Sequence, residues 1–249
     1  MDLESILEAV AAGERSVEEA RRDIEGYTRV EDFARLDTDR PDRAGVPEVV
    51  LGEGKSEEQL RSIVTEFLKE RGRVLVSRLT SREAESLTTL APSVDWYERS
   101  GMLVLRKESV DVPRCDGTVA VLSGGTADVP VAEEAVVTAR EMGCSVETYY
   151  DVGVAGIHRT LSEATNFGGA DAVVVAAGRE GALPTVVAGL VDVPVIGLPV
   201  STGYGHGGGG EAALSGMLQS CTVLSTVNID AGFVAGAQAA QIARNAGGT

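Results

Sequence analysis

The chain has 249 residues, with 22 basic and 38 acidic side chains and a formal net charge of −16. This length favours two domains over one. The acidic excess argues against partners such as nucleic acid or an anionic membrane, because both would be repelled at long range. Only three of the basic residues are lysines, a composition that we associate with salt-adapted proteins.

Three cysteines, Cys115, Cys144 and Cys221, show no paired spacing, so we expect neither a disulfide framework nor a zinc knuckle. The N-terminus is acidic where a signal peptide needs basic residues. The longest apolar stretch, near residues 186–200, is interrupted and shorter than the roughly 18 residues of a membrane helix. The sequence therefore predicts a cytoplasmic protein without a membrane contact.

Residues 1–116 are expected to form a small α+β domain. Residues 1–26 resemble two short helices, and Ser16 followed by Glu19 is typical of the capping box that starts the second. Residues 27–47 are polar and proline-containing, which indicates an extended connection. The remaining elements expected in this domain are strands at 48–51, 73–78, 94–97 and 102–106 and a crossover helix at 56–71.

Residues 117–249 alternate strand and helix five times, which predicts a doubly wound parallel sheet covered by helices on both faces. The expected strands are 118–122, 146–150, 171–176, 194–198 and 223–229. The expected helices are 129–143, 158–168, 181–190, 210–220 and 233–245. Ligands of such sheets bind beyond the carboxyl ends of the strands, so the loops that follow the strands are the candidate site.

The loop after the first of these strands is rich in glycine and hydroxyl groups. Its candidate ligand-binding residues are Ser123, Gly124, Gly125, Thr126 and Asp128. Glycine amides and hydroxyls at a helix N-terminus suit a phosphate group. The alternative is an ordinary strand-to-helix turn in which Asp128 caps the helix.

Three further loops carry groups with candidate chemistry. Asp151, His158 and Arg159 lie near a helix start, where Arg159 could bind a phosphate or pair with Asp151. Glu180 follows Gly178 at a strand end, where it could act as a base or simply stabilise the first helical turn. A loop running from Ser201 through Gly203 to residue 210 is glycine-rich enough for close approach or movement, although a flexible excursion without a ligand is the alternative.

Cys221 stands between the fourth helix and the last strand of this half. A single cysteine in such a place is more often a buried apolar residue than a nucleophile. Residue chemistry alone therefore leaves its role open.

Taken together, these segments resemble the pyridinium-3,5-biscarboxylic acid mononucleotide synthase family (LarB), which begins the assembly of a nickel-pincer nucleotide cofactor. The glycine loop and the His158–Arg159 element are also similar to the aminoimidazole ribonucleotide carboxylases (PurE). The matching stretches are ARLDTDR (34–40), PEVVLGEGK (47–55), SGGTADVPVAEEA (123–135), YDVGVAGIHR (150–159), EGALP (180–184), TGYG (202–205), GMLQSC (216–221) and NIDAGF (228–233).

The resemblance implies an α/β protein whose C-terminal domain is flavodoxin-like and PurE-like, with three layers. It further implies that the substrate is nicotinic acid adenine dinucleotide, carboxylated at ring C5 from CO2 or bicarbonate and cleaved to release AMP. Cys221 would be the transient covalent catalyst and Glu180 the base. Lys55 and the loop residues named above would bind the substrate, with no tightly bound cofactor. Mg²⁺ would assist the cleavage, with Asp128 or Asp151 as candidate anchors.

The same resemblance implies a homo-oligomer, with an octamer expected from related folds, and the apolar helix at 233–245 is a candidate subunit interface. Two rival functions remain at this stage. One is a purine-pathway carboxylase or mutase, which needs neither a covalent cysteine nor the N-terminal domain. The other is a nucleotide-binding protein without catalysis.

Overall fold

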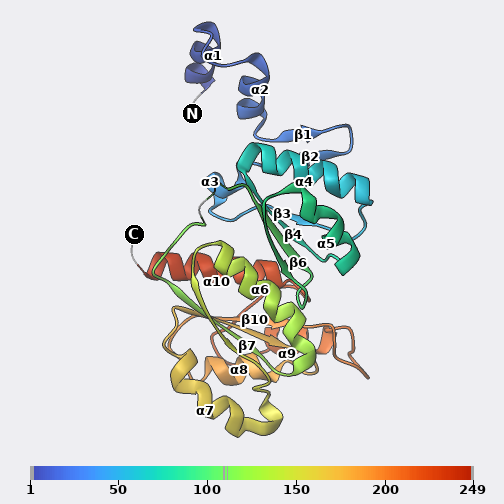
Figure 1. The fold of residues 1–249 in the computed structure, drawn as a ribbon. Helices are drawn as coiled ribbons and strands as arrows, with labels where there is room; N and C mark the ends of the chain where they lie inside the picture. The colour runs from blue at the N-terminus through green and yellow to red at the C-terminus, as the bar shows by residue number, and fades with distance from the viewer. Residues whose placement is uncertain (1–2, 109, 111, 248–249) are drawn as a thin grey trace. The chain divides into compact units, whose positions relative to one another are not determined.

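The computed structural model describes residues 3–108, 110 and 112–247 (Figure 1). The chain divides into two compact units. One unit comprises Met1–Asp95 with Leu103–Val110, and the other comprises Trp96–Met102 with Asp111–Thr249. Each unit has its own sheet and is described separately below.

The N-terminal unit begins with the two expected helices, α1 (Leu3–Ala11) and α2 (Val17–Glu25). The Ser16 hydroxyl accepts a hydrogen bond from the Glu19 backbone N–H at 3.2 Å, and Glu19 accepts one from the Ser16 backbone N–H, so the capping box is confirmed. The expected extended connection is wrong in part. It contains an antiparallel hairpin of β1 (Thr28–Val30) and β2 (Ala34–Leu36), followed by the short helix α3 (Arg40–Ala44).

A four-stranded sheet in the order β3-β4-β6-β5 follows, and all of it lies in this unit except Trp96, Tyr97 and Met102. Its strands are β3 (Val49–Leu51), β4 (Arg73–Ser77), β5 (Ser93–Tyr97) and β6 (Met102–Arg106). Parallel pairing of β3 with β4 through α4 (Glu57–Arg71) confirms the predicted βαβ unit, whereas β4 and β6 run antiparallel. The short helix α5 (Ser81–Leu87) was not predicted.

The C-terminal unit is a five-stranded, fully parallel sheet in the order β11-β10-β9-β7-β8. Its strands are β7 (Thr118–Ser123), β8 (Ser145–Tyr149), β9 (Ala172–Ala177), β10 (Val195–Pro199) and β11 (Ser225–Thr226). Its helices are α6 (Val129–Glu141), α7 (Ile157–Phe167), α8 (Ala182–Ala188), α9 (Glu211–Leu218) and α10 (Gly232–Ala246). This strand order is that of flavodoxin-like sheets and confirms the predicted fold class.

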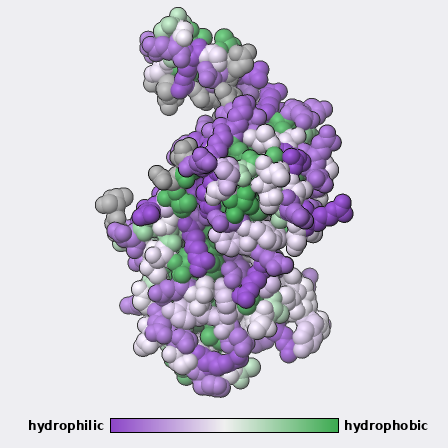
Figure 2. Space-filling view, in the orientation of Figure 1, coloured by the Kyte–Doolittle hydropathy of each residue, from purple (hydrophilic) through white to green (hydrophobic). Residues whose placement is uncertain are grey.

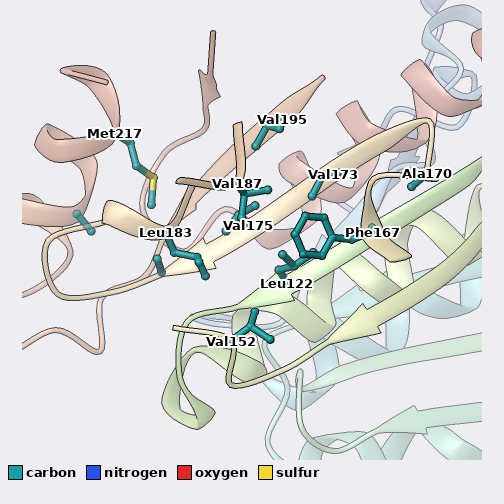
Figure 3. Close-up of a cluster of buried hydrophobic side chains, with 13 residues drawn as sticks. Leu122, Val152, Phe167, Ala170, Val173, Val175, Leu183, Val187, Val195 and Met217 are labelled. Atoms are coloured by element: carbon teal, nitrogen blue, oxygen red, sulfur yellow. The ribbon is translucent and has the colours of Figure 1, made fainter. Parts of the chain in front are cut away.

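The buried side chains explain this arrangement. Every residue of β9 and β10 is buried, as expected for strands covered on both faces. On one face, the cluster in Figure 3 joins Phe167 of α7, Leu183 of α8 and Met217 of α9 to the inner strands. On the other face, α10 packs against α6 so closely that a Cβ at Gly236 would clash with the Ala135 carbonyl. The alanine-rich face of α10 is therefore buried within the chain, and a subunit interface on the remaining surface of this helix stays a prediction.

Hydrophilic residues predominate on the face drawn in Figure 2, in keeping with the acidic composition. Among the helices of the described residues, none combines the length and the apolar character that crossing a bilayer requires.

Candidate active site

A cavity of about 390 Å³ lies at the carboxyl ends of the parallel strands in the C-terminal unit. Loops after β7, β8, β9 and β10 contribute to it, and the adjacent strands β7 and β9 are where the strand order reverses. Ligand sites of open parallel sheets occur at this switch point. The residues that line the cavity are Gly124, Gly125, Ala127, Asp128, Gly153, Val154, Ala155, Arg159, Ala177, Gly178, Arg179, Glu180, Gly181, Ala182, Leu183, Thr202, Gly203 and Tyr204.

Asp128 is the buried carboxylate of this cavity, with 7% of its surface exposed. Its Oδ1 accepts a hydrogen bond from the Thr202 hydroxyl at 2.9 Å, and its Oδ2 accepts one from the Gly125 backbone N–H at 2.9 Å. The Gly178 backbone N–H donates to the same carboxylate. One side chain therefore joins the loops that follow β7, β9 and β10.

Burial raises the pKa of Asp128, and its hydrogen bonds offset that effect only in part. The folded chain thus holds the proton more tightly than the unfolded chain does. The free energy of unfolding is therefore expected to fall as pH rises from the ordinary carboxyl range through the folded-state pKa of this group. Below that interval both states are protonated, and above it both are ionised, so the slope vanishes on either side.

Asp128→Asn removes this titration while keeping the side-chain shape. We expect the variant to gain stability relative to the native protein as pH rises through the interval, and the difference to be constant above it. Urea unfolding of both proteins at a series of pH values measures the difference. A stability difference that is the same at every pH would contradict the expectation.

Close backbone approaches explain the glycines that the sequence places here. A Cβ at Gly178 would lie 3.1 Å from both the Asp128 Oδ1 and the Thr202 Oγ1. A Cβ at Gly203 would lie 2.9 Å from the Arg179 backbone nitrogen, and one at Gly153 would clash with the Gly124 carbonyl. The floor of the cavity is therefore built from backbone that larger side chains would push apart.

Arg159 lines the cavity and pairs with Asp151, whose Oδ2 lies 2.6 Å from the Arg159 Nη1. Of the two alternatives that the sequence left open, the structure has the ion pair. Asp151 occupies the left-handed region with φ of 57°, which is uncommon for a residue other than glycine. A guanidinium has five N–H donors, so the pair with Asp151 leaves Arg159 with capacity for a further anion.

The two residues that the family resemblance assigns to catalysis differ in their position. Glu180 lines the cavity and is exposed. Cys221 is exposed as well, but it is not among the residues that line the cavity. It follows α9, and α9 packs on the Glu180 loop so closely that a Cβ at Gly216 would clash with the Glu180 carbonyl oxygen.

The other predicted site residues lie outside the cavity lining. Ser123 is fully buried beneath the loop, where its Oγ accepts a hydrogen bond from the Asp151 backbone N–H. His158 and Thr126 are exposed at the starts of α7 and α6. The Ser201 backbone N–H donates to Asp230 at 2.9 Å. A direct contact of any of these with a ligand stays a prediction.

Lys55 belongs to the N-terminal unit, where its Nζ donates to the Leu51 carbonyl at 2.8 Å. Its part in substrate binding also stays a prediction. Among the lining residues that were not predicted individually, Thr202, Tyr204 and Arg179 carry polar or aromatic side chains. Their position in the two glycine-containing loops after β9 and β10 was the signal that could have drawn attention to them.

The cysteines differ in their environment, and this predicts the order in which they react. Cys144 is buried, and burial together with the nearby Cys115 raises its pKa to about 12. The Cys115 thiol lies 3.2 Å from the Cys144 sulfur and is partly buried, whereas Cys221 is exposed. Because thiolates are the reactive form, we expect a maleimide at neutral pH to label Cys221 first and to leave Cys144 unlabelled.

Peptide mass spectrometry after timed labelling measures this order, and urea-unfolded protein, in which all three thiols are accessible, is the control. Labelling of Cys144 at the rate of Cys221 in the folded protein would show that the environment described above does not protect it.

The described residues do not form a magnesium site on their own. No group of three His, Cys, Asp or Glu side chains among them could hold a metal ion. Both oxygens of Asp128 accept hydrogen bonds, and Asp151 pairs with Arg159. The two anchors expected from the family resemblance are thus already engaged within the protein.

Comparison with known proteins matches both halves of the chain. Residues 27–107 match the LarB/PurE-like N-terminal domain, and residues 118–247, more than half of the chain, match AIR carboxylase. An uncharacterized protein of Methanocaldococcus jannaschii is 36% identical over 253 residues, which cover 98% of this chain and 97% of that protein.

Two further similar proteins match about half of this chain. An N5-carboxyaminoimidazole ribonucleotide mutase of Pyrococcus horikoshii is 28% identical over 134 residues, 51% of this chain and 67% of that protein. The N5-carboxyaminoimidazole ribonucleotide mutase of Methanocaldococcus jannaschii is 33% identical over 118 residues, which cover 46% of this chain and 71% of that protein. Each of these two matches leaves about half of this chain uncovered.

Proposed function

Because the chain belongs to the LarB family, with a LarB/PurE-like N-terminal domain followed by an AIR carboxylase domain, we propose that it carboxylates nicotinic acid adenine dinucleotide. The products are pyridinium-3,5-biscarboxylic acid mononucleotide and AMP. A carboxylase-type enzyme is what the family supports, and the dinucleotide substrate and the covalent cysteine are our proposal.

One observation carries this proposal. A single cavity at the switch point of the sheet is lined both by the glycine-rich loop after β7 and by Glu180. The helix N-terminus that follows such a loop suits a phosphate, and an exposed carboxylate at the same cavity can accept a proton from a bound ring. A substrate that carries both phosphates and a reactive ring requires this combination.

The proposed chemistry begins with the Cys221 thiolate, which adds to C4 of the pyridinium. The new C–S bond uses the sulfur electron pair, and the ring becomes a neutral enamine whose C5 is nucleophilic. C5 then attacks CO2 and forms the new C–C bond. Glu180 accepts the C5 proton, and the electron pair of that bond expels the thiolate and restores the aromatic cation.

The second half of the reaction is hydrolysis of the phosphoanhydride by water, which releases AMP. The guanidinium of Arg159 lines the cavity, whereas the backbone amides of Gly124 and Gly125 already donate to the Ala176 carbonyl and to Asp128. We propose that Arg159 holds a phosphate and that Asp128 joins the surrounding loops through its hydrogen bonds to Thr202 and Gly125.

Mass spectrometry of the protein incubated with nicotinic acid adenine dinucleotide and ¹³C-bicarbonate tests the proposal. A labelled dicarboxylated pyridinium mononucleotide together with AMP is the expected result. The assay is run over a range of KCl and magnesium concentrations, because the acidic, lysine-poor composition is typical of salt-adapted proteins. Dinucleotide that is unchanged under all these conditions would rule the proposed reaction out.

A second candidate is the conversion of an aminoimidazole ribonucleotide, which the similarity to the mutases favours. That reaction would use the same cavity but neither Cys221 nor the N-terminal domain. Incubation of the protein with N5-carboxyaminoimidazole ribonucleotide distinguishes the two, since turnover there together with none on the dinucleotide would favour the second candidate. We further propose that the protein is a cytoplasmic homo-oligomer. Light scattering would measure the mass of the oligomer.

A further inference from the structure

The rim of the cavity carries a stacked pair of side chains that the reaction proposed above does not use. Arg179 follows β9 and Tyr204 follows β10, and the Arg179 Cζ lies 4.4 Å from the centroid of the Tyr204 ring. Both residues line the cavity, and 74% of the Tyr204 surface is exposed. A guanidinium over an aromatic face at this distance is a cation–π contact, and the exposed part of the ring leaves room for a planar ligand.

The backbone beneath the pair is fixed. Arg179 occupies the left-handed region with φ of 45°, next to Gly178 and packed against Gly203. Asp128 accepts hydrogen bonds from Gly178, in the loop after β9, and from Thr202, in the loop after β10. The two side chains therefore rise from loops that are held together, which presents them to a ligand as one unit.

The charges around the cavity leave Arg179 available to bind an anion. Asp128 and Glu180 are acidic lining residues, and Arg159 is already paired with Asp151. No ion pair engages Arg179 among the residues that the structure describes, and its contact is with the Tyr204 ring. In a chain of net charge −16, such an arginine is an available donor for an anion.

We infer that Arg179 and Tyr204 form a subsite for a nucleoside 5′-monophosphate, and in the proposed substrate for its adenylate half. The neutral purine stacks on Tyr204, while the guanidinium donates to the phosphate. The positively charged pyridinium ring is a poorer occupant, because the Arg179 cation repels it. This inference rests on the proposed function for the identity of the ligand, and it assigns Arg179 and Tyr204 as residues that select the adenylate.

Calorimetric binding of AMP to the full-length protein tests the subsite without turnover. The variants are Arg179→Asn, since asparagine tolerates a left-handed backbone, together with Tyr204→Leu and Tyr204→Phe. We expect AMP to bind about 10-fold more weakly to Arg179→Asn and roughly 5- to 10-fold more weakly to Tyr204→Leu. Tyr204→Phe keeps the aromatic face and is expected to bind AMP as the native protein does.

Nicotinic acid mononucleotide is the second probe, and its affinity is expected to be the same in all variants. Arg140→Gln, which removes an exposed charge of α6 outside the cavity lining, is the matched control for net charge. Native AMP affinity in Arg179→Asn, or an equal loss for both probes, would overturn the inference, as would an absence of AMP binding to the native protein. Failure of the carboxylation assay with the AMP result intact would instead remove the proposed reaction and leave a nucleotide subsite.

Discussion

Replacing Cys221 by alanine is expected to abolish formation of the dicarboxylated pyridinium, with turnover reduced by a factor on the order of 10⁴ or more. The physical reason is that C5 of a pyridinium cation is electron-poor and does not attack CO2. Addition of a thiolate at C4 is the step that makes C5 nucleophilic, and alanine has no electron pair to donate. Labelled product from native and variant protein, quantified by mass spectrometry, measures the loss.

Cys115→Ala is the matched control, because it removes a thiol that lies beside Cys144 and outside the cavity lining. We expect it to retain native turnover. Intact-mass measurement adds a second readout, since the native protein with substrate should show a covalent adduct that Cys221→Ala lacks. Product formation by Cys221→Ala at the native rate would exclude the covalent route and favour a mechanism like that of a mutase.

The fold of the C-terminal unit could be predicted because its signals are strong and repeated. Runs of Val and Ala such as residues 172–177 are buried on both faces, and only helices on both sides of a parallel sheet achieve that burial. The last strand was predicted over 223–229 but pairs only at Ser225–Thr226. This edge strand consists of two polar residues, and its length is set by how far it pairs with β10 rather than by its own sequence pattern.

The hairpin of β1 and β2 could not be predicted in the same way. Three-residue strands have too few positions to show alternation, and their pairing depends on Thr28 facing Leu36 across the turn. The helix α3 was not predicted because Pro41 was interpreted as a sign of an extended chain. Proline is also common in the first turn of a helix, because a backbone N–H at that position would have no partner within the helix.

Part of the candidate site followed from the rule that places ligands at the carboxyl ends of parallel strands. Gly124, Asp128, Gly178 and Glu180 were expected there and line the cavity. The hydrogen bond between Asp128 and Thr202 was not predictable, because it joins residues 74 positions apart whose loops meet only once β7, β9 and β10 are in register. The burial of Ser123 likewise depends on which way one side chain points at the end of β7.

Glu180→Gln is expected to lower kcat by roughly 10²- to 10⁴-fold while KM changes little, because glutamine keeps the shape of the side chain but cannot accept the C5 proton. The blocked step, removal of the C5 proton, follows C–C bond formation, so the carboxylated ring should accumulate on Cys221. Intact-mass measurement would show this species as an adduct heavier than the uncarboxylated adduct by one ¹³C-carboxyl group. Glu211→Gln, an exposed glutamate in the first turn of α9 outside the cavity lining, is the control and should turn over normally.

The two variants together separate the roles of the cysteine and the carboxylate. Cys221→Ala stops the reaction before any adduct forms, whereas Glu180→Gln stops it with the adduct in place. If Glu180→Gln turned over at the native rate, another carboxylate would have to accept the proton. Asp128 would be the lining residue to examine, since burial raises its pKa and makes it a stronger base. If Glu180→Gln lost both turnover and adduct, the glutamate would act before ring carboxylation, in binding the substrate rather than in removing its proton.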